Sequence, residues 1–202
     1  MAYRRTPRIQ ARLDAQRQGI VRAATALVSE SGYAACSIAR VAARAGVAPG
    51  TVYNHFASKG DVLADVFRAV VTQEVAAVRT AVTSGTAAER IAAVIETFAG
   101  RALKAPRLAY ALLAEPVDAR IEALRLQFRQ AFCDIVADAV ADGVAQGQLP
   151  PQNPAVTAAA LVGAIGEVLV GPLDTGAAEP DTVPTLIGFA LRGIGALDDT
   201  HA

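Results

Sequence analysis

Apolar residues in this chain recur at the three- and four-residue spacing that places them on one face of a helix. The first such run extends from Gln10 to Ser31, where Leu13, Ile20 and Leu27 share a stripe and the arginines lie off it. No segment alternates apolar and polar residues as a half-buried strand does. The pattern therefore predicts an all-α protein with about nine helices.

Residues that start and stop helices divide the chain further. Ser37 is a natural N-cap for a short helix that ends at Gly46. Pro49 suits the first turn of a second short helix, which runs through Phe56, because its missing N–H has no helical partner there. The remaining helices are predicted over residues 58–83, from 86 through 98, between 106 and 116, and over 118–146, 154–170 and 181–197. Ser58 and Thr86, each with an acidic residue three positions on, are the predicted N-caps of the first two.

The last two predicted helices are apolar on more than one face. Such helices need cover on two sides, which the centre of an intersubunit four-helix bundle provides, whereas burial within one chain is the alternative. We expect a homodimer whose interface contains Leu161, Ile165, Leu169, Leu186, Ile187 and Phe189. Glu167 and internal glycines interrupt the apolar stretch 155–173, which favours a buried helix over a membrane span.

The net charge of zero hides a strong asymmetry. Residues 1–60 contain nine Lys and Arg against two acidic residues, whereas the remainder contains ten basic and seventeen acidic ones. A basic N-terminal third joined to an acidic remainder indicates a polyanionic partner for the first part alone.

The few cysteines and histidines argue against an enzyme. Cys36 and Cys133 are far apart with no CxxC spacing, so neither a disulfide framework nor a zinc site is indicated. The only histidines are His55 and His201, which makes a Ser/His/Asp or Cys/His centre improbable. We expect no catalytic site, metal or cofactor, and a cytoplasmic protein, because the N-terminus has no apolar core of a signal peptide.

Two short helices joined through Ala45-Gly46-Val47-Ala48 have the size and the glycine-bearing turn of a helix-turn-helix. Beyond that turn, the sequence Ala-Gly-Val is followed by Gly-Thr-x-Tyr-x-His-Phe-x-x-Lys over residues 50–59. This dense signature resembles the DNA-binding domain of TetR-type (TetR/AcrR) helix-turn-helix transcriptional regulators, and the resemblance covers about residues 15–65. It implies a basic flexible arm (1–9), a three-helix DNA-binding domain (10–60) and a helical ligand-binding and dimerisation domain (61–202).

The resemblance also implies a homodimeric repressor that binds a palindromic double-stranded DNA operator and is released by a small molecule. Ser37 would offer its backbone N–H to a phosphate, and Thr51, Tyr53, His55 and Lys59 match positions that touch the DNA backbone or base edges. Ala39 and Ala48 offer no hydrogen bonds to a base, so readout would fall to Thr51, Asn54 and either Arg40 or Arg44. The full set of candidate DNA-binding residues is Ser37, Arg40, Arg44, Pro49, Gly50, Thr51, Tyr53, Asn54, His55 and Lys59. Packing is the alternative role for Tyr53 and His55, and a solvated charge the alternative for Lys59.

A pocket for the small molecule is expected among the helices from Asp61 to Gln146. Aromatic and aliphatic side chains would form its wall, with few polar tips to orient a ligand, which favours a largely apolar effector. The candidate ligand-binding residues are Phe98, Tyr110, Leu113, Arg125, Phe128 and Phe132. A competing hypothesis is that the same fold binds small molecules or serves an architectural role without sequence-specific DNA binding.

Overall fold

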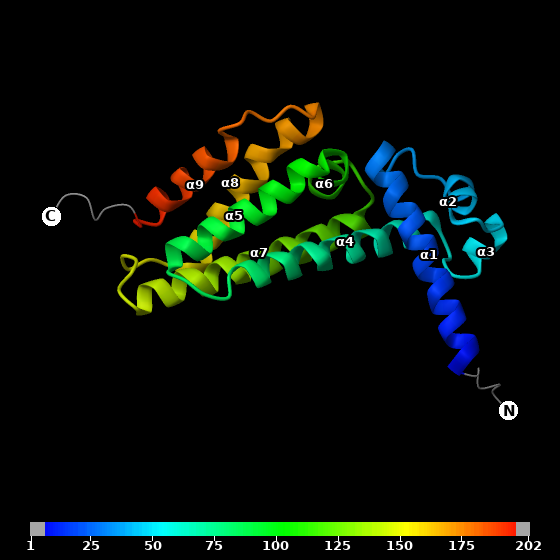
Figure 1. The fold of residues 1–202 in the computed structure, drawn as a ribbon, viewed down its shortest axis with the longest axis horizontal. Coiled ribbons are helices and arrows are strands. Elements are labelled where there is room, and N and C mark those ends of the chain that lie inside the picture. Colours follow the sequence, from blue (N-terminus) through cyan, green and yellow to red (C-terminus); the bar gives the residue numbers. More distant parts are fainter. Residues whose placement is uncertain (1–6, 197–202) are drawn as a thin grey trace.

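The computed structural model describes residues 7–196, which form nine helices and no strand (Figure 1). The helices are α1 (Pro7–Ser31), α2 (Ile38–Ala45), α3 (Pro49–Tyr53), α4 (Lys59–Ala81), α5 (Ala87–Lys104), α6 (Pro106–Leu113), α7 (Ala119–Ala145), α8 (Pro154–Thr175) and α9 (Thr182–Gly193). The all-α prediction is therefore confirmed over the described residues.

The first three helices form a unit at one end of an elongated molecule, and α4 leads out of it beside α7 (Figure 1). The caps predicted from the sequence are formed: the Ser37 hydroxyl accepts a hydrogen bond from the Arg40 N–H at 3.3 Å, and the Ser58 hydroxyl accepts one from the Asp61 N–H at 3.2 Å. Gly46 ends α2 in the left-handed conformation with φ of 67°, which a side chain rarely adopts.

Two apolar cores hold the molecule together. The first joins α1, α2 and α3 to the beginning of α4, with Ile20, Val41, Val52, Phe56 and Phe67 almost fully buried. It also takes in side chains of α6 and α7, so the N-terminal unit packs directly on the C-terminal helices. The second core fills the bundle of α5, α7, α8 and α9.

Some helix ends differ from the predicted ones. The N-terminal helix begins at Pro7, so Pro7, Arg8 and Ile9 are helical and not part of an arm. Proline at the first helical position explains the earlier start. The rest of the predicted arm, residues 1–6, lies outside the described residues. The last helix, α9, was predicted to reach residue 197 but ends at Gly193, and Gly195 after it has a φ of 75°. At the other end, α8 continues through Pro172 to Thr175 and stops at Gly176, whose φ is 70°.

The structure places four of the six residues predicted for dimerisation inside the chain's own core. Leu161, Ile165, Leu169 and Leu186 are buried in the second core of their own chain, which leaves them little surface to offer a partner. Ile187 is half-buried, and only Phe189, at 52% exposure, presents a large apolar side chain to solvent. Periodicity located the apolar helices correctly, but it did not distinguish the inward from the outward stripe when both are apolar.

One helix of the described chain, α8, is long and apolar enough to cross a membrane by length and composition, with a mean hydropathy of 1.8. Only 28% of its most apolar window is buried within the chain. Most of its exposed residues are small or β-branched, namely Ala155, Val156, Ala159, Ala160, Gly163 and Val168, and Glu167 and Asp174 are exposed with them.

Candidate functional site

The outer side of α3 presents a row of accessible residues. Val52 is fully buried and Phe56 nearly so, and these two side chains anchor the helix to the first core. Pro49, Gly50 and Asn54 are exposed, Thr51 is half-buried and Tyr53 is 56% exposed. The Tyr53 side chain is therefore not held in the core by packing, and a partner can reach it.

The two arginines of α2 already have partners within the chain. Arg44 forms a two-pronged ion pair with Glu30 of α1, with both N–O distances at 2.7 Å. Arg40 donates to the carbonyl oxygen of Ala35 at 2.7 Å. Both side chains remain exposed, but a base contact by Arg44 would require its ion pair to open.

His55 is half-buried and its ring is held against α1. The Nε2 atom lies 2.9 Å from the Gln16 Oε1 atom, at hydrogen-bond distance. The ring thus supports the docking of α3 on α1, which is the packing role considered for it. Its Nε2 atom is engaged with Gln16 and is not free to contact a base.

Arg17 completes this attachment, although the sequence pattern gave no sign of it. Its guanidinium donates to the His55 carbonyl oxygen at 2.6 Å and pairs with Asp65 of α4 at 2.5 Å. It also lies over the Phe56 ring, 4.2 Å from the ring centre. One side chain of α1 therefore fixes the end of α3 and the start of α4.

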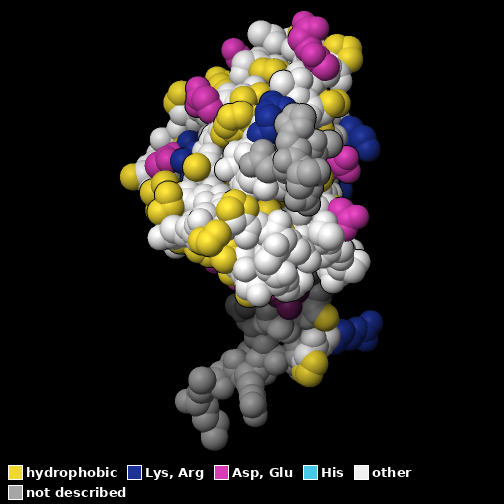
Figure 2. Space-filling model, turned by 90° about the vertical axis from the view of Figure 1, so that its left-hand side faces the viewer, with side chains coloured by type: hydrophobic (Ala, Val, Ile, Leu, Met, Phe, Trp, Pro, Cys, Tyr) yellow, Lys and Arg dark blue, Asp and Glu magenta, His cyan; other side chains and the backbone are white. Residues whose placement is uncertain are grey.

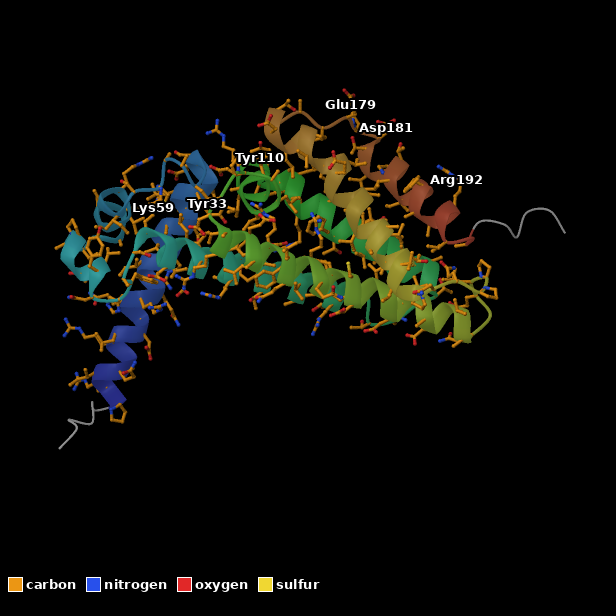
Figure 3. The ribbon with its side chains drawn as sticks, turned by 180° about the vertical axis from the view of Figure 1, so that it is seen from behind. Tyr33, Lys59, Tyr110, Glu179, Asp181 and Arg192 are labelled. Carbon is orange, nitrogen blue, oxygen red and sulfur yellow. The ribbon has the colours of Figure 1, made fainter. Side chains whose placement is uncertain are left out.

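Ser37 and Lys59 mark the starts of two helices beside α3. Both are exposed, and Lys59 is the first residue of α4. No ion pair within residues 7–196 engages Lys59. Figure 3 shows Lys59 at the end of the molecule formed by α1, α2 and α3, whereas Glu179 and Asp181 lie along the upper edge, away from that end.

A cavity of about 120 Å³ lies between α4, α5, α6, α7 and α8. Its wall is largely apolar, with two aromatic pairs: Phe67 and Phe128 with ring centres 5.5 Å apart, and Phe98 and Phe132 at 5.0 Å. We call this space the effector cavity. Of the residues predicted to line it, the structure brings together Phe98, Leu113, Arg125, Phe128 and Phe132.

Tyr110 is the exception and does not line the effector cavity. Its neighbour Ala109 does, and one residue along a helix turns the side chain by about 100°, so Tyr110 packs on the second core instead. Figure 3 shows Tyr110 on α6, near the end of the molecule that contains Tyr33.

Four charged side chains also border the effector cavity: Glu74, Arg101, Arg125 and Arg129. Glu74 forms a two-pronged ion pair with Arg101 at 2.6 and 2.9 Å, and this pairing raises the pKa of Arg101. Arg125 is mostly buried and bonds to Glu122 at 2.5 Å.

Arg125 also connects the effector cavity to the first three helices. It donates to the carbonyl oxygens of Leu112 and Glu115 at 2.9 Å each, which fixes the segment after α6. The Glu115 carboxylate in turn accepts the backbone N–H groups of Tyr33 and Ala34 at 3.0 and 3.1 Å. We call this chain of contacts the Glu115 link.

Further contacts run beside the Glu115 link. Arg107 of α6 donates to the Glu30 carbonyl oxygen at 2.6 Å, and Arg120 of α7 pairs with Asp61 of α4. Hydrogen bonds from Ser58 and Arg120 lower the pKa of Asp61. The Tyr33 side chain is 4% exposed, and its hydroxyl has no hydrogen-bond partner among the described residues. Burial raises the pKa of Tyr33.

The two cysteines occupy apolar surroundings. Cys36 is buried in the first core and Cys133 is half-buried against the second. Burial raises the pKa of both thiols, which keeps them protonated near neutral pH. No cluster of three or more metal-ligating side chains occurs within residues 7–196.

Several solved structures share this fold over nearly their whole length. The fatty acid degradation regulator FadR from Bacillus halodurans is 18% identical, with a TM-score of 0.77 over 96% of this chain and 98% of that one. FadR from Bacillus subtilis, solved in complex with stearoyl-CoA, is 20% identical with a TM-score of 0.76, over 89% and 98%. A TetR transcription regulator from Haloarcula marismortui is 18% identical with a TM-score of 0.79, over 91% and 98%.

Comparison by sequence alone found no match among curated proteins. Residues 20–66, however, match the sequence model for bacterial regulatory proteins of the tetR family. These residues contain the end of α1, the helix-turn-helix of α2 and α3, and the start of α4. Residues 20–66 are therefore similar in sequence to the helix-turn-helix domain of the tetR family of bacterial regulatory proteins, and the chain as a whole shares the fold of the solved structures named above.

Proposed function

We propose that this protein is a cytoplasmic, homodimeric transcriptional repressor that binds a palindromic operator and is released from it by a small, largely apolar effector. Residues 10–60 act as the DNA-binding domain, and residues 61–202 hold the effector and form the dimer. The observation that carries the proposal is that one chain contains both an accessible helix-turn-helix and an apolar cavity, and that the Glu115 link connects the two.

The exposed face of α3 supports DNA binding. Thr51 and Asn54 offer short polar groups to base edges, while Ser37, Tyr53 and Lys59 flank them at positions suited to phosphates. Pro49 and Gly50 lack side-chain donors and allow the backbone to approach the groove. Because Arg44 is paired with Glu30 and His55 with Gln16, we assign Arg44 to holding α2 on α1 and His55 to holding the end of α3 on α1. Of the α2 arginines, only Arg40 remains a candidate for a phosphate contact.

The exposed face of α8 and α9 supports a dimer. Apolar and small residues that one chain leaves uncovered would pack on the same residues of a second copy around a two-fold axis. A groove between the two helices is lined by Ala164, Val168, Leu186 and Phe189 together with polar residues of the α8–α9 connection. A two-fold dimer also matches a palindromic operator, since each half-site receives one helix-turn-helix.

The effector cavity supports regulation by a ligand. In the FadR structure from Bacillus subtilis the same fold is described with bound stearoyl-CoA. A ligand shifts the DNA-binding equilibrium only if it binds one arrangement of the two heads better than another. We assign the transmission to α4, which lines the cavity and begins beside α3, and to the Glu115 link.

Selection of bound sequences from random duplexes by the purified protein tests the proposal. We expect enrichment of a palindrome whose half-sites are about one helical turn of DNA apart or a multiple of it. Binding without any sequence enrichment would favour the competing hypothesis of a ligand-binding or architectural protein.

A further inference from the structure

More basic than acidic side chains border the effector cavity. Of its three arginines, Arg101 is paired with Glu74, and Arg125 is paired with Glu122 and occupied by backbone carbonyl groups. Arg129 lies one helical turn after Arg125 and is exposed. No ion pair or side-chain hydrogen bond within residues 7–196 involves Arg129.

Arg129 borders the effector cavity and is also exposed to solvent, so a ligand in the cavity can reach it. It is on α7 between Phe128 and Phe132, both of which line the cavity, yet it remains exposed. The cavity thus reaches the surface at a point where an unpaired guanidinium is next to aromatic side chains. A guanidinium binds carboxylate and phosphate groups in a planar, two-pronged geometry.

We propose that the effector is an amphipathic anion, with an apolar chain among the phenylalanines and an anionic end held by Arg129 at the mouth. This inference rests on the proposed function and narrows its ligand. It assigns the charged contact to Arg129 and not to Arg125, the arginine predicted from the sequence, because the donors of Arg125 are already engaged in holding the segment after α6.

Three probes with the same alkyl chain separate the contributions of the chain and the charge: dodecanoate, its CoA thioester and 1-dodecanol. Their binding to the full-length dimer, without DNA, is measured by isothermal titration calorimetry. We expect both anions to bind more tightly than the alcohol. The Arg129→Gln variant should weaken binding of the anions about tenfold or more and leave binding of 1-dodecanol unchanged.

Two control variants make the result specific. Arg129→Lys keeps the positive charge and should restore most of the affinity, whereas Arg79→Gln removes an exposed arginine of α4 that does not line the cavity and should change nothing. A loss limited to the CoA thioester would identify its phosphates as the bound group, and a loss for both anions would identify any anionic end. Either outcome supports the proposal.

Equal affinity of the wild-type protein for dodecanoate and 1-dodecanol would overturn the inference, and so would an Arg129→Gln variant that binds both anions normally. Binding of none of the probes would also overturn it. The selection of palindromic duplexes is carried out without any of these probes. A failure of the probes to bind therefore does not affect the test of DNA binding, and failure of the effector proposal can be told apart from failure of the proposed function.

Discussion

Lys59 is the residue whose proposed role can be tested most directly. It is exposed at the start of α4 and has no ion-pair partner in the described chain, so its replacement should not disturb the fold. Lys59→Ala should weaken binding to specific and non-specific duplexes alike, because a phosphate carries no sequence information. The slope of log affinity against log salt should fall by roughly 0.9 for each contact, or about 1.8 for a dimer. Fluorescence anisotropy across a salt series measures this slope, and an unchanged value would make Lys59 a solvated charge.

Replacement of Asn54, unlike that of Lys59, should reduce sequence preference and not affinity for all duplexes alike. Its side chain is exposed at the C-cap of α3, and an amide that pairs with a base edge contributes discrimination of about 1–3 kcal/mol. Asn54→Ala should therefore relax the preference at one position of each half-site and leave non-specific binding nearly intact. Repeating the duplex selection with this variant, and with Thr51→Ala for comparison, measures the effect. A uniform loss across sequences would instead indicate a backbone contact.

The residues of the site differ in how far the sequence could predict them. Thr51, Asn54 and Lys59 were predicted because the signature around them is local, and they are accessible in the structure. Arg17 was missed, since its three contacts reach His55, Phe56 and Asp65, which are far from it in the sequence. A charged residue off the apolar stripe of a helix appears solvated when only its own helix is considered.

Among the elements, the Glu115 link makes a prediction that needs no effector. Replacing the carboxylate by an amide in Glu115→Gln removes the charge that strengthens both hydrogen bonds and leaves one acceptor oxygen for two N–H groups. The amides of Tyr33 and Ala34 should then exchange with solvent about tenfold faster. Hydrogen exchange followed by mass spectrometry measures this rate. Glu96→Gln, at an exposed position of α5, serves as control. If the amides of Tyr33 and Ala34 exchange equally slowly in both variants, the Glu115 carboxylate does not stabilise this segment.

Helix starts were more predictable than helix faces. The caps at Ser37, Ser58 and Thr86 depend on neighbouring residues, and all three form the expected hydrogen bonds. The stripe of α8 that faces the core depends instead on how α5, α6 and α7 pack around it, which no local pattern encodes. This explains why the position of α8 was predicted while Leu161 was assigned to the wrong side.

At the scale of the whole molecule, the end formed by α1, α2 and α3 and the α8–α9 connection differ in charge. Figure 3 shows Lys59 at that end, and Glu179 and Asp181 away from it along the upper edge. In the end view of Figure 2 hydrophobic side chains are dispersed among acidic and basic ones. The arrangement favours approach of DNA to α3 and disfavours it at the α8–α9 connection. A dimer through α8 and α9 would leave both basic heads accessible.

Phe189 is the side chain whose change should separate dimer from monomer. It is 52% exposed on α9, so a charge there costs the isolated chain little, whereas it would be buried against apolar groups in the proposed dimer. Phe189→Asp should give a folded protein of 20.8 kDa by light scattering at micromolar concentration, in contrast to twice that mass for the wild type. Leu126→Asp is the matched control, because Leu126 is 58% exposed on α7, away from the proposed interface. Leu161→Asp would not serve, since a charge in the chain's own core would unfold it. The Phe189 variant should also lose its preference for the full palindrome, because a monomer contacts only one half-site at a time. A wild-type mass of 20.8 kDa under the same conditions would contradict the dimer directly.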